Sequence, residues 1–178
     1  MSIKVNYNNM MASAIGNKGI AEEEYASYAK FAKTAHAKVE EGRGQGMQGW
    51  MDSPYDQAEV VKRIKDTAKR IRKSCEYFVV LGIGGSALGP IAVFTALKHL
   101  YYNDLPKRVR KGPKFYVIDN VDPERMNALF DVIDVNKTVF NVITKSGATS
   151  ETMSQYLIVM DILTKKLGDK ASEHIIST

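Results

Sequence analysis

The sequence predicts an α/β protein with a parallel sheet and helices on both faces. Three short apolar runs, residues 77–81, 114–119 and 138–143, have the length and composition of strands buried on both faces. The segments between them carry apolar residues at helical spacing, and the final EHIIST resembles the opening of a fourth strand. Alternation of strands and helices is typical of a parallel sheet with right-handed crossovers.

The part of the chain ahead of the first strand is predicted to be helical. Residues 21–41 and 56–73 show helical spacing, and an irregular segment with the only tryptophan, Trp50, separates them. We therefore expect two parts. One is an N-terminal helical segment over residues 1–73 that packs on the sheet domain, and the other is the sheet domain itself, over residues 74–178.

Each helix of the sheet domain has boundary signals in the sequence. The first is expected to begin after Pro90. Asp122 can cap the second helix, with a proline at the first helical position. Thr149 or Ser150 can cap the third helix, and Gly168 is expected to end it.

Composition and charge exclude several classes of protein. No apolar run approaches the roughly 20 residues of a membrane span, and the first residues lack the pattern of a secretion signal. The single cysteine, Cys75, excludes an internal disulfide and fits a reducing, cytoplasmic location. The net charge is +5, with basic clusters at residues 62–73 and 107–114. Because no aromatic residues are interleaved with them, we expect no nucleic-acid partner.

A glycine turn follows the first predicted strand. Gly82, Gly84, Gly85 and Ser86 come in quick succession before the helical pattern begins. Glycines let the backbone approach a ligand closely, and the N–H groups of a helix's first turn favour an anion. The Ser86 hydroxyl adds a donor. These residues predict an anion cradle, although a tight turn without a ligand has the same pattern.

A second polar loop follows the third predicted strand. Residues 144–149 read TKSGAT, with one cation, Lys145, and three hydroxyls ahead of a helix start. In a 2-1-3-4 strand order the first and third strands are neighbours, and ligands bind beyond the carboxyl ends of the strands at that point. We therefore expect this loop and Ser86 to face one crevice. The hydroxyls suit a single phosphate, although Ser and Thr at a helix start are also common as simple caps.

A dinucleotide site fits the same residues less well. Gly82, Gly84 and Ala87 match G-x-G-x-x-G/A loosely, but the acid expected about 20 residues on is Asp119, which comes much later than that. No GK[ST] sequence follows the glycines, which excludes a P-loop. A nucleotide-binding domain would be revived by binding of a nicotinamide or flavin cofactor.

The two loops together resemble the phosphoglucose isomerase family. Residues 82–90, GIGGSALGP, resemble the first sugar-phosphate motif of that family, and residues 144–152, TKSGATSET, resemble the second. The segment around Trp50 resembles a glycine-tryptophan segment of bacterial members. The resemblance implies a flavodoxin-like sugar isomerase (SIS) domain. It also implies interconversion of glucose 6-phosphate and fructose 6-phosphate through an enediol, without a metal or other cofactor.

Matching the motifs residue by residue implies the roles of individual residues. The positions that bind the substrate phosphate are Ser86, Thr144, Lys145, Ser146 and Thr149. The glycines that shape the two loops are Gly84, Gly85 and Gly147. Thr144 stands where the family usually has serine, and Ala148 stands where it has threonine. Glu151 is a candidate crevice carboxylate, or a capping partner in the first turn of its helix.

The resemblance also implies that the reaction needs residues outside this sequence. The family's general base, the arginine that steadies the enediolate and the ring-opening groups lie in a later part; no GGR occurs here, and His174 does not match. Proton transfer between adjacent carbons needs a base beside both. We therefore expect an N-terminal fragment with no catalytic residue, inactive alone and homodimeric when full-length. The alternative is a non-catalytic SIS module that senses a sugar phosphate for a regulator.

Overall fold

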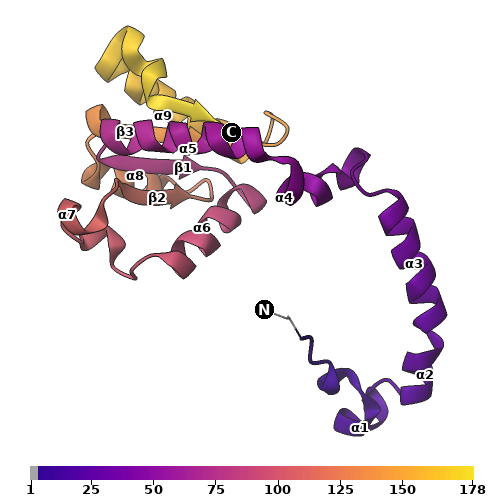
Figure 1. Ribbon diagram of the computed structural model, residues 1–178. Helices are drawn as coiled ribbons and strands as arrows, with labels where there is room; N and C mark the ends of the chain where they lie inside the picture. The colour runs from indigo at the N-terminus through magenta and orange to yellow at the C-terminus, as the bar shows by residue number, and fades with distance from the viewer. Residues whose placement is uncertain (1–3) are drawn as a thin grey trace. The chain divides into compact units, whose positions relative to one another are not determined.

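The computed structural model describes residues 4–178 (Figure 1). The described chain divides into two compact units between Val61 and Lys62. The domain boundary after residue 73 stays a prediction. Within residues 4–178 no helix combines the length and apolar character that crossing a membrane would require.

The first unit is helical. Its elements are η1 (Asn8–Met10), α1 (Ala12–Ile15), η2 (Gly16–Lys18), α2 (Glu22–Ser27), α3 (Ala29–Glu41), η3 (Gly46–Asp52), α4 (Ser53–Asp56) and the start of α5 (Ala58–Ser74). The single helix expected over residues 21–41 is wrong, because it is interrupted at Tyr28. The Ser27 hydroxyl donates to the Glu24 carbonyl, 2.7 Å away, and the Tyr28 N–H turns to the Tyr25 carbonyl at 3.3 Å. A serine that bonds to a backbone carbonyl in this way weakens and often bends a helix, which fits the interruption here.

The second unit is built on a four-stranded parallel sheet. Its strands are β1 (Tyr77–Leu81), β2 (Lys114–Ile118), β3 (Thr138–Val142) and β4 (Ile175–Ser177). The strand order is β2-β1-β3-β4, and all pairs are parallel. The prediction of a parallel sheet in the 2-1-3-4 order is confirmed, and β1 and β3 are neighbours at the point where the strand order reverses.

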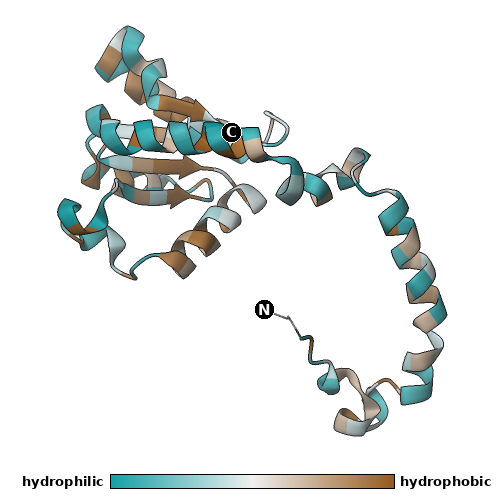
Figure 2. Ribbon diagram, in the orientation of Figure 1, coloured by the Kyte–Doolittle hydropathy of each residue, from teal (hydrophilic) through white to brown (hydrophobic). Residues whose placement is uncertain are grey.

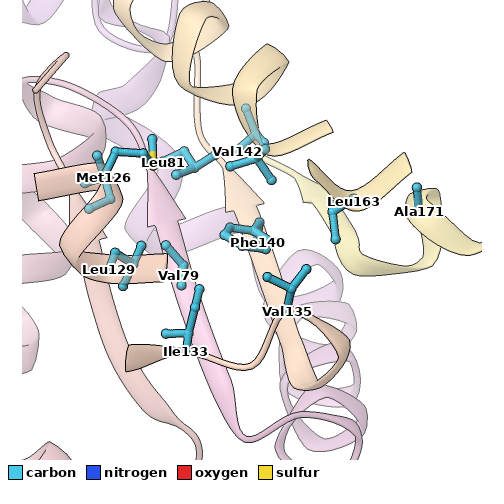
Figure 3. Packing of buried hydrophobic residues seen from close by; sticks show 12 residues of the cluster. Val79, Leu81, Met126, Leu129, Ile133, Val135, Phe140, Val142, Leu163 and Ala171 are labelled. Atoms are coloured by element: carbon cyan, nitrogen blue, oxygen red, sulfur yellow. The ribbon is translucent and has the colours of Figure 1, made fainter. Parts of the chain in front are cut away.

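Helices lie on both faces of this sheet. The remaining elements of the unit are α6 (Gly85–Leu97), η4 (Tyr102–Asp104), α7 (Lys107–Arg110), α8 (Pro123–Val132), η5 (Val135–Lys137), α9 (Ser150–Leu167) and η6 (Gly168–His174). The main core is on the face of α8 and α9, where fully buried Val79, Leu81 and Phe140 meet Met126 and Leu129 (Figure 3). Alternate strand residues point to the opposite face. Figure 2 shows mainly apolar residues along the strands and residues of mixed hydropathy along the helices.

The predicted start of the helix after Pro90 is wrong. Helix α6 begins at Gly85, and Pro90 lies inside it. Proline has a backbone angle suited to a helix but lacks the N–H that would bond to the carbonyl of Ser86. Gly84, with φ of 54°, makes the turn into the helix well before the proline signal indicates. Ser86 therefore belongs to the first turn of α6 rather than to a loop ahead of it.

Two other boundary predictions are confirmed. The Asp122 carboxylate caps α8 by accepting hydrogen bonds from the N–H groups of Glu124 (3.0 Å) and Arg125 (3.1 Å). Gly168, with φ of 57°, follows the last residue of α9. This positive-φ conformation, with ψ of −128°, costs glycine little, which explains why α9 ends there.

Candidate phosphate-binding site

The sheet places the two predicted loops side by side. The N–H of Gly82 donates to the Ile118 carbonyl (3.2 Å), and the N–H of Ile143 donates to the Leu81 carbonyl (2.9 Å). The hydrogen-bond ladder thus continues just beyond the strands. As a result, the loop after β1 starts between the ends of β2 and β3, and the loop after β3 starts beside it.

Gly82 holds the first turn of α6 against the end of β3. A Cβ atom added at this glycine would lie 2.9 Å from the Ser86 Cβ, 3.2 Å from the Ser86 carbonyl oxygen and 3.3 Å from the Ile143 carbonyl oxygen. Only glycine fits between these groups without a shift of the backbone. Because Ile143 directly precedes Thr144, this contact brings Ser86 close to the root of the second loop.

The start of α6 presents open backbone beyond the sheet. The Gly84 carbonyl accepts hydrogen bonds from the N–H groups of Ala87 (3.0 Å) and Leu88 (2.8 Å), which fixes the first turn. Gly84 and Gly85 are exposed, and no heavy atom lies within 4 Å of a Cβ added at either position. A ligand can therefore approach the main chain at this helix start. Half-buried Ser86 lies in the same turn.

The second loop joins two of the predicted hydroxyls. The Thr144 and Thr149 Oγ1 atoms are 3.3 Å apart, and both residues are half-buried. Between them, the Ser146 hydroxyl accepts a hydrogen bond from the Ala148 N–H at 3.2 Å, and Gly147 turns the chain with φ of 70°. Residues 145–148 are exposed. The loop is thus a short polar arch that begins at β3 and ends at α9.

The N-terminus of α9 has no side-chain cap. Thr149 occupies the predicted capping position, but its side chain makes no capping hydrogen bond. Thr149 pairs across the loop with Thr144 instead. The first N–H groups of an α-helix have no partner within the helix. At α9 they are not consumed by a neighbouring side chain, which is the state that suits an anion.

One hydroxyl and one cation at the two loops are free to meet a ligand. Within residues 4–178, neither the Ser86 hydroxyl nor the exposed Lys145 ammonium hydrogen-bonds or ion-pairs with another side chain. Half-buried Glu151 lies in the first turn of α9, and its role as a crevice carboxylate stays a prediction. The same residues contain no cluster of three or more His, Cys, Asp and Glu side chains that could hold a metal ion.

Two residues weighed from the sequence have local structural partners. Asp119, considered for a ribose, forms an ion pair with Arg125. His174, for which the sequence predicts no catalytic role, places its Nδ1 2.6 Å from the Thr138 carbonyl oxygen. Both contacts lie within the sheet domain, and each gives the side chain a purpose that needs no ligand.

Sequence reasoning missed one residue that supports the second loop. The N–H of Thr178 donates to the Val142 carbonyl (2.9 Å), and its carbonyl accepts from the N–H of Thr144 (3.2 Å). The Thr178 hydroxyl also donates to Asn141 (3.0 Å). The root of the loop is thereby fixed by β4 as well as by β1. The EHIIST pattern signals a strand, and the expected 2-1-3-4 order places it beside the third strand, but neither indicates that Thr178 reaches the root of the loop.

Comparison with known proteins agrees with this geometry. A profile of the phosphoglucose isomerase family matches residues 55–178, a range that includes β1, both loops and the whole sheet. The chain belongs to the phosphoglucose isomerase family. It is similar over its whole length, at 48% identity, to the glucose-6-phosphate isomerase of Carboxydothermus hydrogenoformans. It is also 36% identical over 162 residues to that of Shouchella clausii.

The similarity covers only part of each relative. The chain spans 38% of the length of the Carboxydothermus hydrogenoformans protein and 36% of that of Shouchella clausii. Two solved structures are similar to this chain, again over only part of their own length. A hypothetical protein from Thermus thermophilus is 30% identical, with a TM-score of 0.71 over 87% of this chain and 35% of its own. A glucose-6-phosphate isomerase from Chlamydia trachomatis is 25% identical, with a TM-score of 0.52 over 68% of this chain and 23% of its own.

Proposed function

We propose that this chain forms the phosphate-binding portion of a glucose-6-phosphate isomerase, which interconverts glucose 6-phosphate and fructose 6-phosphate. One observation carries the proposal. The N-termini of α6 and α9 follow neighbouring strands of one sheet, and each is bordered by a polar side chain, Ser86 at α6 and Lys145 ahead of α9, that pairs with no other side chain of residues 4–178. Two such helix starts favour a compact anion between them.

The residues of the two loops have different proposed roles in binding the phosphate. We assign hydrogen-bond donation to Ser86, Thr144, Ser146 and Thr149, and charge neutralisation to Lys145. Gly84, Gly85 and Gly147 keep the loops open to the ligand. A compact phosphate suits this set because hydroxyls and backbone N–H groups can surround its terminal oxygens. Charge-assisted hydrogen bonds of this type are roughly twice as strong as neutral ones.

The arrangement anchors a substrate without supplying the reaction. Phosphate binding gives remote binding energy and orients the sugar carbons. Moving a proton between two carbons needs a base beside both of them, and the only carboxylate assigned near the loops is Glu151. We therefore expect residues 1–178 to bind a sugar phosphate and to show no isomerase turnover alone. A homodimer and a cytoplasmic location for the full-length protein are part of the same proposal.

An amide NMR titration of the 178-residue chain tests the site. Fructose 6-phosphate and inorganic phosphate should both shift the amides of residues 84–87 and 145–150, and NAD should leave them unchanged. The Ser86→Ala and Lys145→Gln substitutions should each weaken binding of fructose 6-phosphate by roughly 10- to 150-fold, since a charge-assisted hydrogen bond is worth roughly 1.5–3 kcal/mol.

Two matched controls accompany these variants. Ser154→Ala removes a hydroxyl that bonds only to the Ser150 carbonyl (2.8 Å), and Lys166→Gln removes an exposed cation from the last turn of α9. Both should bind fructose 6-phosphate as the unchanged chain does. Shifts with NAD alone would overturn the proposal in favour of a nucleotide domain. Family-like turnover of residues 1–178 in a coupled assay would refute the division between anchor and base.

A regulatory SIS module is the second candidate. It would bind the same sugar phosphates, so binding data do not separate it from the enzyme portion. The match to glucose-6-phosphate isomerases over the whole chain favours the enzyme. The deciding measurement is the isomerase activity of the gene's complete product, with the Lys145→Gln variant expected to raise KM.

A further inference from the structure

We propose that the sheet domain carries a second ligand site, for a small aromatic anion, at the end of the sheet opposite to the phosphate loops. A cavity of about 330 Å³ lies there among α5, α6, the starts of β1 and β2 and the loop after α7. All of its lining residues belong to the second unit. Sites for small molecules in proteins usually have volumes of about 300–1,000 Å³.

The position of the cavity separates it from the phosphate site. Phe78 and Phe115 line it, and they are paired at the second positions of β1 and β2. The phosphate loops instead follow the last strand residues, Leu81 and Val142. Three residues of strand correspond to about 10 Å. The cavity also lies on the sheet face of α5 and α6, opposite to the core of Figure 3.

Aromatic rings form one side of the cavity. Phe94 stacks on Phe115, with ring centroids 4.3 Å apart and an interplanar angle of 23°. Phe94 also forms a T-shaped contact with Tyr102, with ring centroids 5.0 Å apart and an interplanar angle of 85°. The phenylalanine rings are only half-buried, so part of their surface remains open. Aromatic clusters of this geometry favour another ring in offset or edge contact.

Cations surround these rings without an acidic partner. Arg72, Lys98, Arg110 and Lys111 all line the cavity, and no aspartate or glutamate of the described residues does. None of the four forms an ion pair with a carboxylate of residues 4–178. A concentration of one sign of charge along a recessed wall attracts the opposite charge. The cavity is therefore matched to an anion.

The structure holds two of these cations in place. The Arg110 guanidinium donates to the carbonyls of Leu105 (2.7 Å) and Gly112 (2.9 Å). The Lys98 ammonium lies 5.7 Å from the centre of the Tyr102 ring. Burial raises the pKa of Tyr102, so its hydroxyl stays neutral and adds no negative charge. A ligand with a planar ring and a carboxylate or phosphate satisfies both the rings and the cations.

Titration with 1-naphthyl phosphate tests this site on the whole 178-residue chain. Amide NMR should show shifts at Phe78, Phe94, Lys98 and Phe115 that inorganic phosphate and uncharged 1-naphthalenemethanol each fail to produce at the same concentration. Shifts confined to residues 84–87 and 144–150 would overturn the proposal, because the probe would then bind only at the phosphate loops, through its phosphate group. No binding at millimolar concentration would also overturn it.

Three variants of the cavity and one control make the test specific. Arg72→Gln and Lys98→Gln should each weaken binding of 1-naphthyl phosphate by about tenfold. Lys69→Gln, which removes an exposed cation from the same helix as Arg72 but outside the cavity, should have no effect. Ala68→Leu fills the cavity without changing its charge and should abolish the shifts at Phe94 and Phe115. Equal affinities for Arg72→Gln and Lys69→Gln would refute the role of the cavity cations.

Discussion

The Gly82→Ala substitution tests how tightly the phosphate loop is built. The added methyl group would lie 2.9 Å from the Ser86 Cβ and within 3.3 Å of two carbonyl oxygens, those of Ser86 and Ile143. Real Cβ atoms do not approach other atoms at 2.9 Å, so α6, the end of β3 or both have to move. Neither carbonyl belongs to a flexible side chain, which leaves a backbone shift as the only relief.

The cost follows from that shift. Inserting a methyl group into a packed region typically destabilises a protein by about 1–3 kcal/mol. Some stabilisation comes from the smaller entropy of the unfolded chain with alanine, about 0.4–1 kcal/mol. We expect a net loss of roughly 1–2 kcal/mol, which corresponds to a fall in Tm of about 3–6 °C for a chain of this size. Moving Ser86 should also weaken phosphate binding.

Gly89→Ala is the matched control. Gly89 lies in the same helix, is exposed, and has no heavy atom within 4 Å of an added Cβ. Alanine in a helix interior is favoured over glycine by about 0.8–1 kcal/mol, but a Cβ on the residue before Pro90 is disfavoured in helical backbone, so we expect this variant to be about as stable as the unchanged chain. Urea unfolding of the two variants and of the unchanged chain measures both effects. If Gly82→Ala is as stable as Gly89→Ala, the loop accommodates the added methyl group without cost, and the steric argument is wrong.

Two further predictions concern helix starts in the sheet domain. Asp122→Ala removes the carboxylate that caps α8 and should lower the free energy of unfolding by about 1 kcal/mol in urea, whereas Asp131→Ala, an exposed change on the same helix, should not. The pKa of Asp134 is lowered by its hydrogen bonds with the Asn136 side chain and backbone. The stability that this ionised carboxylate contributes is present above its unfolded-state pKa of about 3.9 and is lost as pH falls through the lower folded value. Between about pH 5 and 2.5, the urea midpoint of unfolding should therefore fall less steeply for Asp134→Asn than for Asp131→Asn. Equal slopes for the two variants would contradict the assignment.

The sheet was predictable because its signals are local and its topology has few solutions. Apolar runs separated by helical segments leave a parallel sheet as the main option, and the order β2-β1-β3-β4 follows the common doubly wound pattern. The helix boundaries that failed depend on competition between local signals. Pro90 is typical of a helix start, but the chain already turns into the helix at Gly84, which has φ of 54°. Ser27 fits the helical pattern of the sequence, yet its hydroxyl donates a hydrogen bond to the Glu24 carbonyl within the helix.

The candidate site was predictable as two loops, but not as a set of contacts. Motif spacing placed Ser86 and residues 144–149 after neighbouring strands, and the structure confirms those strand positions. The pairing of Thr144 with Thr149 could not be read from the sequence, since a threonine ahead of a helix fits a cap equally well. The support from Thr178 depends on the register of β4 against β3, which the expected strand order does not specify.

The position of Gly82 indicates why the two proposed sites can be separated by experiment. Its contacts act on Ser86 and on the end of β3, both at the carboxyl edge of the sheet. The rings of Phe78 and Phe115 pair earlier along the strands, where the register is fixed by the β1–β2 ladder rather than by the turn. Substitutions at separate sites that share no partner usually have additive effects. A change at Gly82 should therefore weaken phosphate binding while 1-naphthyl phosphate still reaches the aromatic cavity. If both ligands are lost together, α6, which extends from the phosphate turn to Leu97 beside Lys98, transmits the disturbance between them.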